Sequence, residues 1–421
     1  MLHDSGIIGK LNELYGDSDG SFIVGYGNKI NVRSSAGNRT HTFVSGNYNN
    51  TTSCSESLIC GDHNNASDCE FSLIFGINNN FLNGDACFLG GRDNLIRTSG
   101  DNSIFMGYGS ETNHIENSFI FGCNSKIYAS NFSLIFGQTD TNGTINYSTI
   151  IGHNNTTKEN NAYIKETGES IQRSFIFGVD NIISKIEDAI IIGNSNNIQN
   201  IYAQNENDHS YNLTIGFNNS SSNSKASITI GDNNLINSNI ENGCIIGKNN
   251  IIRFGSNGSF LLGEGNISEN GAISSIILGK NNININGAKL AVSIGNNLHN
   301  NFVNGTVLGH YNEYPRVNEL VTGKLLVLGN GYMDNQNVVH RSNCLEINED
   351  GSQEIILQDK TLNSTLGIGK IKIKQEKIIF ESLKENSSQQ IETVEFTFED
   401  LKQIKQNSQL PNLDNNSYPT T

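Results

Sequence analysis

Carboxylates and histidines are the side chains in this sequence that could carry out chemistry. Enzymes that cleave glycans need two carboxylates at a defined separation, but here the acidic residues share no recurrent position, as shown by Asp62, Asp68, Asp85, Asp93, Asp101 and Glu111. His63, His153 and His310 follow recurring glycines by one or two residues and have no paired carboxylates beside them. We therefore predict no enzyme activity, no metal site and no cofactor.

Binding is a better prediction than catalysis at two interruptions of an otherwise regular repeat. Residues 154–172 include Tyr163, and residues 197–212 include Tyr202, His209 and Tyr211. Loops on a rigid scaffold often carry binding residues, and exposed tyrosines suit contact surfaces. We predict these four residues as binding candidates; lateral loops without a ligand are the alternative.

The composition indicates a narrow solenoid rather than ordinary globular domains. The chain has 421 residues, of which only 35% are hydrophobic, with 43 Gly, 3 Pro and no Trp. A disordered chain also has few apolar residues, but it does not place Ile, Leu and Phe at fixed intervals. The net charge of −15 disfavours a nucleic-acid partner, which requires a basic face.

Several cellular contexts are disfavoured by the same sequence. No segment has 18 consecutive apolar residues, so membrane insertion is not expected. Residues 1–6 lack the basic and apolar regions of a signal peptide. The seven cysteines show no zinc spacing, and Cys60 and Cys244 take positions that hold aliphatic residues in other repeats. We expect reduced cysteines that act as small hydrophobic residues, which fits folding in a reducing cytosol.

A short unit recurs along most of the chain, and residues 72–79 are a good copy of it. It has a small residue, three mostly apolar residues, a glycine, two variable residues and an asparagine. Most intervals between the glycines are 14 to 16 residues, and the longer intervals contain insertions. The marker glycines are Gly9, Gly25, Gly46, Gly61, Gly76, Gly91, Gly107, Gly122, Gly137, Gly152, Gly178, Gly193, Gly216, Gly231, Gly247, Gly263, Gly279, Gly295, Gly309 and Gly329.

An asparagine column keeps phase with the glycines. Asparagine tolerates left-handed backbone geometry, and stacked asparagines can bond to one another as a ladder. The column contains Asn12, Asn28, Asn49, Asn64, Asn79, Asn94, Asn155, Asn181, Asn196, Asn219, Asn234, Asn250, Asn266, Asn282 and Asn312. Serine recurs four places before the glycine, as at Ser72, Ser118 and Ser133.

Each repeat therefore reads as one coil with a buried strand before the glycine, a tight corner and a second short strand. The three residues before the glycine are β-branched or aromatic and suit a buried strand. Stacked coils can bury an apolar face that one coil cannot, and 20 coils would span roughly 95 Å. So thin a coil exposes apolar strand surface, which side-by-side assembly would cover.

These phased columns resemble the head repeat of trimeric autotransporter adhesins, the YadA-like repeat, over residues 5–331. The resemblance implies an all-β fold: a left-handed parallel β-roll of about 20 coils in an intertwined or side-by-side homotrimer. Asn stands here where adhesin heads more often have Ala, and neither the export signal nor the membrane anchor of an adhesin is recognisable. Asn-rich rolls resemble those of bacteriophage fibre and tail proteins, where a segment similar to residues 341–351, beginning Arg-Ser-Asn, often follows the roll.

The pattern changes towards the C-terminus, which leads us to predict two domains, residues 1–331 and 332–421. The second is expected to be β-rich, with a turn at Asp350-Gly351, a hairpin around residues 375–376 and a strand over residues 394–398. Residues 399–406 could form a short helix before a polar tail. This region would set the trimer register or attach to a larger assembly, or it would simply cap the roll.

The resemblance implies a structural and adhesive fibre protein of a bacteriophage virion, a tail or head fibre assembled in the host cytoplasm. Its partners would be two further copies of itself, other virion proteins through the C-terminal region, and a cell-surface glycan or protein receptor. Because the repeats begin almost at Met1, attachment through the C-terminal region is expected. Alternatives are the head or passenger fragment of an adhesin on a bacterial cell surface, and a polysaccharide depolymerase.

Overall fold

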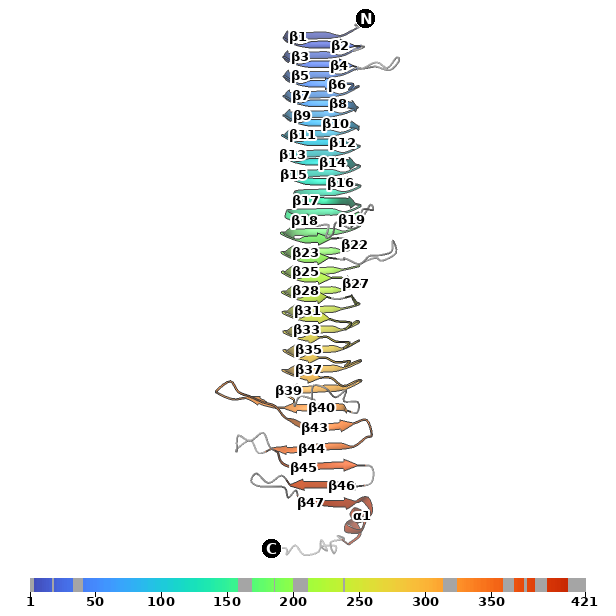
Figure 1. Cartoon of the computed structure of the whole chain (residues 1–421), viewed down its shortest axis with the longest axis vertical. Helices are drawn as coiled ribbons and strands as arrows, with labels where there is room; N and C mark the ends of the chain where they lie inside the picture. The colour runs from blue at the N-terminus through green and yellow to red at the C-terminus, as the bar shows by residue number, and fades with distance from the viewer. Residues whose placement is uncertain are drawn as a thin grey trace, which may run out of the picture. The chain divides into compact units, whose positions relative to one another are not determined.

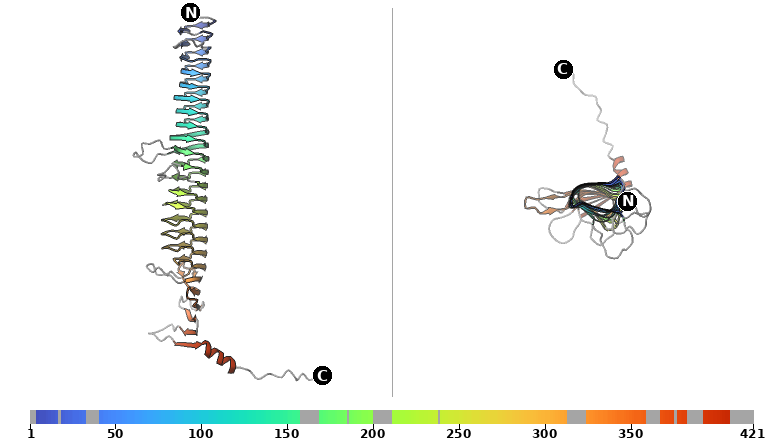
Figure 2. Two further views of the ribbon diagram at one scale, coloured as in Figure 1. Left: turned by 90° about the vertical axis from the view of Figure 1, so that its right-hand side faces the viewer. Right: turned by 90° about the horizontal axis from the view of Figure 1, so that it is seen from above.

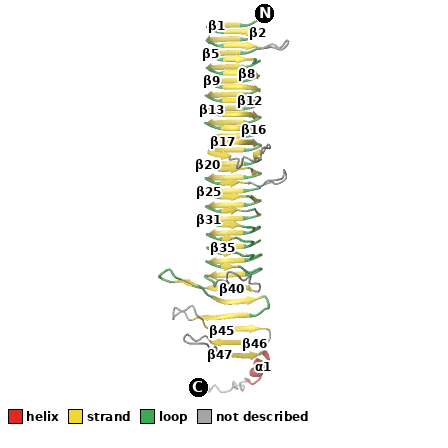
Figure 3. Ribbon diagram, viewed as in Figure 1, coloured by secondary structure: helices red, strands yellow, loops and turns green. Residues whose placement is uncertain are grey.

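Stacked β-strands make up most of the protein in the computed structural model (Figures 1 and 3). The structure describes residues 4–16, 19–32, 41–157, 169–184, 186–199, 211–237, 239–312, 324–358, 367–374, 377–382 and 392–407. Strands account for 65% of the chain and helix for 2%, and the strands form a parallel β-solenoid of about 17 turns. The predicted all-β solenoid is therefore confirmed, whereas its left hand and the trimer stay predictions. The number of turns is lower than the predicted 20 coils, although every marker glycine lies in a strand. The segments that connect some of these strands include residues outside the described ranges.

The chain divides into two units, Met1–Asn249 and Asn250–Thr421. In the first unit each marker glycine lies in a strand that pairs in parallel with the same strand of the next coil, and we call these the glycine strands. They are β1 (Gly6–Lys10), β3 (Phe22–Tyr26), β5 (Phe43–Asn47), β7 (Leu58–Asp62), β9 (Leu73–Ile77), β11 (Phe88–Arg92), β13 (Ile104–Tyr108), β15 (Phe119–Cys123), β17 (Leu134–Asn146), β18 (Thr149–Thr157), β20 (Phe175–Val179), β23 (Ile190–Asn194), β25 (Leu213–Phe217), β28 (Ile228–Asp232) and β31 (Cys244–Lys248).

The other side of each coil carries the return strands, which also stack in parallel. Strands β17 and β18 continue around the corner into this side, so they have no separate return strand directly after the glycine. The return strands of the first unit are β2 (Glu13–Gly16), β4 (Lys29–Val32), β6 (Asn50–Thr52), β8 (Asn65–Glu70), β10 (Asn80–Asp85), β12 (Leu95–Asp101), β14 (Glu111–Glu116), β16 (Lys126–Asn131), β19 (Glu169–Gln172), β21 (Ile182–Ser184), β22 (Ile186–Glu187), β24 (Asn197–Gln199), β26 (Ser220–Ser222), β27 (Ser224–Lys225), β29 (Leu235–Asn237) and β30 (Ile240–Glu241).

Only the middle residue of the apolar triplet faces the core, which corrects the prediction that all three form a buried strand. In β9, Ile74 is fully buried, whereas Leu73 and Phe75 on either side are partly exposed. Side chains of a strand alternate between its two faces, so the first and third residues must point outward when the second points inward. The glycine strands therefore have an apolar inner side and an apolar outer side.

The core of the first unit is a narrow file of side chains, mostly one from each strand of a coil. Burying one isoleucine contributes about 1.5–3 kcal/mol, so stability accumulates coil by coil. The inward residues of the glycine strands include Ile23, Val44, Ile59, Ile74, Leu89, Phe105, Ile120, Ile135, Ile150, Ile176, Ile191 and Ile245. The return strands add Ile30, Ala66, Phe81, Ile96, Ile127, Ile183, Ile198 and Ile236.

Close backbone approach explains the glycine column. At Gly76 a Cβ atom would lie 1.8 Å from the carbonyl oxygen of Gly91 in the next coil, and φ is +117°. The same contact recurs at Gly279, where the Cβ would lie 1.9 Å from the oxygen of Gly295. Both the φ angle and the missing space therefore require glycine, because moving the opposing backbone would break the strand pairing.

The asparagine of the column is the predicted left-handed corner residue. In the structure this geometry belongs instead to the residue before it. Asn78 has φ 56° and Ala86, which begins the opposite corner, also has φ 56°, whereas Asn79 has no positive φ. Backbone bonds between coils fix both corners: the N–H of Asn78 donates to Asp62 O (2.8 Å) and that of Ala86 to Glu70 O (2.8 Å). Even Phe132 (φ 49°) and Leu290 (φ 53°) adopt this geometry at corners.

Cys54 and Cys69 form a disulfide between successive coils, which corrects the prediction that all cysteines are reduced. Their sequence separation of 15 residues equals one coil, so both occupy the same buried position in neighbouring coils. Cys87 fits the predicted role of a small hydrophobic residue, because burial raises the pKa of its thiol to about 12. The other free cysteines are Cys60, Cys123, Cys244 and Cys344.

The second unit repeats the coil architecture and then changes to antiparallel strands. Its glycine strands are β33 (Phe260–Glu264), β35 (Ile276–Lys280), β37 (Val292–Asn296), β39 (Thr306–His310) and β40 (Lys324–Asn330), and its return strands are β32 (Ile251–Arg253), β34 (Ile267–Ser268), β36 (Ile283–Asn284) and β38 (His299–Asn300). Strand β40 pairs in parallel with β39 but antiparallel with β43 (Asn343–Asn348). A small hairpin, β41 (Tyr332–Met333) and β42 (Val339–His340), precedes β43 and was not predicted.

An antiparallel meander continues from β43 through β44 (Gln353–Gln358), β45 (Gly367–Lys374), β46 (Lys377–Ser382) and β47 (Glu392–Thr397). The predicted turn at Asp350-Gly351, the second hairpin and the last strand are all present. The predicted helix is α1 (Phe398–Asn407). Its first turn is capped by Thr397, whose hydroxyl accepts from the N–H of Asp400 (3.0 Å).

We expect Gly279→Ala to destabilise the second unit much more than Gly287→Ala. Gly279 has no room for a Cβ, while Gly287 has φ +80° with nothing within 4 Å. Strain plus a backbone clash predicts a cost of about 3–6 kcal/mol at Gly279, against about 1–2 kcal/mol for strain alone at Gly287. Urea unfolding midpoints measure both; equal shifts would show that close approach does not fix the glycine column.

Candidate functional site

Of the four predicted binding residues, only Tyr211 lies in the described part of the chain. Tyr163, Tyr202 and His209 fall outside the described residues. Tyr211 occupies a left-handed corner (φ 40°), and its side chain is exposed. Its backbone N–H donates to Glu187 O (3.2 Å) in the preceding coil. The structure thus places this tyrosine on the surface beside the return strands, where a ligand could reach it.

An ion-paired cluster flanks Tyr211 at the equivalent corners of the two preceding coils. Arg173 donates from Nε to Asp188 Oδ1 (2.8 Å) and from Nη2 to Asp188 Oδ2 (2.9 Å), and it also pairs with Glu187. This bidentate geometry holds the corner between the two insertions. This cluster was not predicted, although Arg173 and Asp188 are separated by 15 residues, which is one coil.

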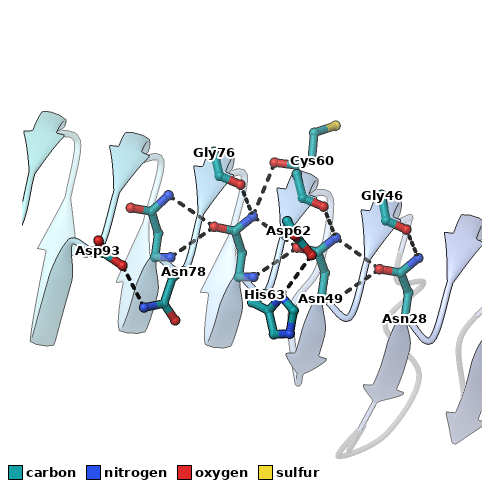
Figure 4. Close-up of polar contacts among 12 residues, drawn as sticks. Asn28, Gly46, Asn49, Cys60, Asp62, His63, Gly76, Asn78 and Asp93 are labelled. Atoms are coloured by element: carbon teal, nitrogen blue, oxygen red, sulfur yellow. Dashed lines mark hydrogen bonds and ion pairs between the residues drawn. The ribbon is translucent and has the colours of Figure 1, made fainter.

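The asparagine column forms a hydrogen-bonded ladder inside the coil corner (Figure 4). The Nδ2 group of Asn79 donates to Asn64 Oδ1 (3.1 Å), to Phe75 O (3.0 Å) and to Gly91 O (3.0 Å). Its Oδ1 accepts from the backbone N–H (3.2 Å) and Nδ2 (3.0 Å) of Asn94. Asn79 therefore ties three coils together at a buried position, where a hydrogen bond is stronger than in water.

The predicted ladder residues lie in these two columns. In the glycine column are Gly76, Gly122, Gly137, Gly152, Gly231, Gly247 and Gly279, and in the asparagine column are Asn79, Asn155, Asn234, Asn250 and Asn282. All five asparagines are buried, and Nδ2 of each donates to the glycine carbonyl of the next coil.

Hydroxyl side chains replace asparagine in the middle of the first unit. Between Asn94 and Asn155, the buried position holds Ser110, Ser125 and Thr139. The N–H of Ser110 donates to Asn94 Oδ1 (3.2 Å), that of Ser125 to Ser110 Oγ (3.1 Å) and that of Thr139 to Ser125 Oγ (3.2 Å). The chain of bonds continues through shorter side chains, although the Thr139 hydroxyl has no partner among the described residues.

Outward-facing apolar side chains form a second surface, which we call the apolar stripe. It consists of the residues one and three places before each marker glycine, on the outer side of the glycine strands. Neighbouring coils stack their rings along it: the centroids of Phe22 and Phe43 are 5.8 Å apart, and those of Phe121 and Phe136 are 5.1 Å apart. Its most exposed members are Ile8, Phe43, Met106, Phe119, Phe136, Phe175, Phe177, Ile190, Ile228, Leu262, Ile276 and Ile294.

The Arg-Ser-Asn segment lies where the second unit changes from parallel to antiparallel strands. Arg341 donates from Nη1 to Asn297 O (2.8 Å) and to Asn312 O (3.3 Å), so it caps carbonyls of two coil corners. The Ser342 hydroxyl donates to Asn330 Oδ1 (2.7 Å). The segment therefore closes the last coil and directs the chain into β43.

Chemical sites are not evident elsewhere in the described residues. They contain no group of three or more His, Cys, Asp or Glu side chains that could hold a metal ion. Within the same residues, no helix is both long and apolar enough to cross a membrane.

We expect Asn79→Ala to destabilise the first unit by about 2–4 kcal/mol, because it leaves several buried partners unsatisfied. The matched control is Asn78→Gly, which keeps the left-handed corner (φ 56°), removes one exposed hydrogen bond from Nδ2 to Asp93 Oδ1 (2.7 Å) and should change stability by about 1 kcal/mol or less. Thermal or urea unfolding of both variants measures the difference. An Asn79→Ala variant as stable as its control would contradict a structural role for the ladder.

Stability of the second unit should fall in mild acid because of His299. Burial, and secondly the charge of Arg341, lower its pKa from 6.5 to about 4. Between pH 6.5 and pH 4 the His299 side chain binds a proton in the unfolded chain but not in the folded chain. The free energy of unfolding is therefore unaffected by this histidine above pH 6.5 and decreases as the pH falls towards 4. Urea midpoints above and below this window should differ less for His299→Gln than for the wild type; an unchanged difference would contradict the assignment.

No protein-family model matches this chain, and neither does any curated protein. The YadA-like resemblance consequently rests on the residues, and the solenoid geometry rests on the structure.

Proposed function

We propose that this chain is a structural and adhesive fibre protein of a bacteriophage virion, a tail or head fibre. In this proposal three copies assemble side by side through the apolar stripe, and the return strands and their corners face outward. The observation that carries the proposal is the stripe itself. A surface made to stay in water would not keep one outer face apolar over so many coils.

The two outer faces of the coils differ in charge. Neither column of the stripe contains Asp, Glu, Lys or Arg at any marker glycine. The return strands carry cross-coil ion pairs instead, such as Arg97 with Glu111 and Arg253 with Glu269. The stripe of the first unit alone would extend for roughly 70 Å at normal strand spacing, and apolar patches of that extent usually mark interaction sites.

Adhesion is assigned to the outward corner that carries Tyr211 and the ion-paired cluster of Arg173, Glu187 and Asp188. These described residues border both insertions, so a receptor-binding surface there would be supported by rigid strands. A cell-surface glycan or protein fits an exposed tyrosine beside paired charges. Attachment to other virion proteins is assigned to the C-terminal region.

An adhesin on a bacterial cell surface is a second candidate, and one observation favours it. The disulfide between Cys54 and Cys69 is typical of proteins that fold outside a reducing cytosol. The apolar stripe and the corner would serve an adhesin head in the same way, so the two candidates differ in location rather than in assembly.

Mass measurement in solution tests the assembly. We expect the wild-type chain to have three times the 46.0 kDa of one copy. Phe136→Lys/Phe177→Lys places charge in the stripe and should weaken association at least about ten-fold. The control Tyr128→Lys/Asn113→Lys changes return strands β16 and β14 and should leave the trimer intact. A monomeric wild type would contradict the proposal, and so would two variants that dissociate to the same extent.

The location is tested by antibody labelling of each terminus on purified virions. A fibre protein predicts label on the particle, with the C-terminal label nearer its body. Label on bacterial cells in the absence of virions would support the adhesin instead.

A further inference from the structure

The C-terminal meander is a single-layer sheet, and no second layer covers either face among the residues that the structure describes. It begins at β40 and runs through β43, β44, β45 and β46 to β47, each strand antiparallel to the next. Among the described side chains after Glu346, only Ile379 is buried. A sheet with an apolar face is stabilised when that face packs against a second layer.

One face of the meander carries two adjacent rows of mostly apolar residues, as the strand register shows. Residues directly opposite each other on neighbouring strands share a face. One row across the sheet contains Leu328, Leu345, Ile355, Ile371, Phe380 and Val394. The adjacent row contains Leu326, Ile347, Gln353, Ile373, Ile378 and Phe396. We call these two rows the meander face; they contain no charged residue.

The opposite face of the meander uses its charges within the chain. Lys372 pairs with Glu381 (2.8 Å), and Lys377 pairs with Glu395 (2.7 Å). Two further pairs lie nearer the coils, Lys324 with Glu346 and Lys370 with Glu354. The charged face also holds the buried Ile379 and otherwise suits solvent, while the meander face has Gln353 as its polar side chain and no charged one.

The meander face continues the apolar stripe of the second unit without a break. Leu328 lies one place before its marker glycine and pairs with Leu308. Leu308 pairs in turn with Ile294, which belongs to the same column of the stripe. On its other side Leu328 pairs with Leu345, the first member of the meander row on β43. The apolar surface thus passes from parallel coils into antiparallel strands at β40.

We propose that the meander face packs against the same face of other copies of this chain, and so locks the copies in register. The inference rests on the self-assembly in the proposed function and names a second contact region for it. Strands of the meander are spaced like the coils, at about 4.8 Å, so a parallel copy presents identical rows at identical heights. A foreign partner would have to match the stripe and the meander with this same repeat.

The coils alone cannot fix the axial register between neighbouring copies of the chain. Successive coils present nearly the same apolar residues, so two stripes could pack with a shift of one coil at little cost. The meander rows are not repeats of one another: Phe380 and Val394 stand opposite only once, and Phe380 and Phe396 make an edge-to-face pair at 6.0 Å. Packing these unlike rows face to face permits one alignment.

Cysteine cross-linking of the full-length chain tests this proposal. Val394→Cys lies on the meander face, and Thr393→Cys, its neighbour on β47, lies on the opposite face; both native side chains are exposed. Under mild oxidation, Val394→Cys should form interchain disulfides more than about ten-fold faster than Thr393→Cys, because only the meander face brings identical residues within disulfide reach. Both substitutions are small and on an exposed strand, so both variants should fold.

The mass of each variant, measured in parallel, separates the two proposals. A monomeric mass would contradict both the proposed self-assembly and the proposed contact between meander faces. A trimer in which Val394→Cys cross-links no faster than Thr393→Cys would overturn the meander contact alone. Co-sedimentation of the wild type with neutral phosphatidylcholine vesicles, abolished by Val394→Lys but not by Thr393→Lys, would instead assign the face to a lipid surface and would also overturn the proposal.

Discussion

The contact on which the rest of the structure depends is the stacking of one glycine backbone directly upon another. The Cβ of any other residue would overlap the next coil's carbonyl oxygen, as at Gly76 over Gly91, where the distance would be 1.8 Å. This close approach brings the asparagine of each coil within reach of the neighbouring glycine carbonyl. The ladder, the left-handed corners and the narrow core all follow from coils held at this separation. In the view down the stack, the coils of the first unit superpose (Figure 2, right).

Much of the coil could be predicted because its columns repeat at one period. The glycine strand, the corner, the return strand and the asparagine ladder all follow from three columns that keep phase. The C-terminal strands were also predictable, because alternation at residues 345–347 and the Asp350-Gly351 turn are local signals. Stacked repeats bury a core that no single repeat can bury, and the regular spacing of apolar residues in the sequence indicates this core.

Other features were not predictable because they depend on which way a side chain points or on what lies in the next coil. The apolar triplet suggested a buried strand, yet strand alternation turns Leu73 and Phe75 outward. The corner asparagine was assigned the left-handed geometry, yet Asn79 uses its side chain in the ladder and Asn78 takes the turn. Cys54 and Cys69 looked like two small hydrophobic residues, and only the coil period places them together. Tyr163, Tyr202 and His209 lie outside the described residues, so their predicted binding role stays a prediction.

We propose that the apolar outer side of the glycine strands lies between copies of the chain. A cryo-electron microscopy reconstruction of the purified full-length protein tests it most directly. We expect three copies with Phe136 and Phe177 facing the common axis and Tyr128 on the outer surface. Single-chain particles, or copies that meet through their return strands, would contradict it.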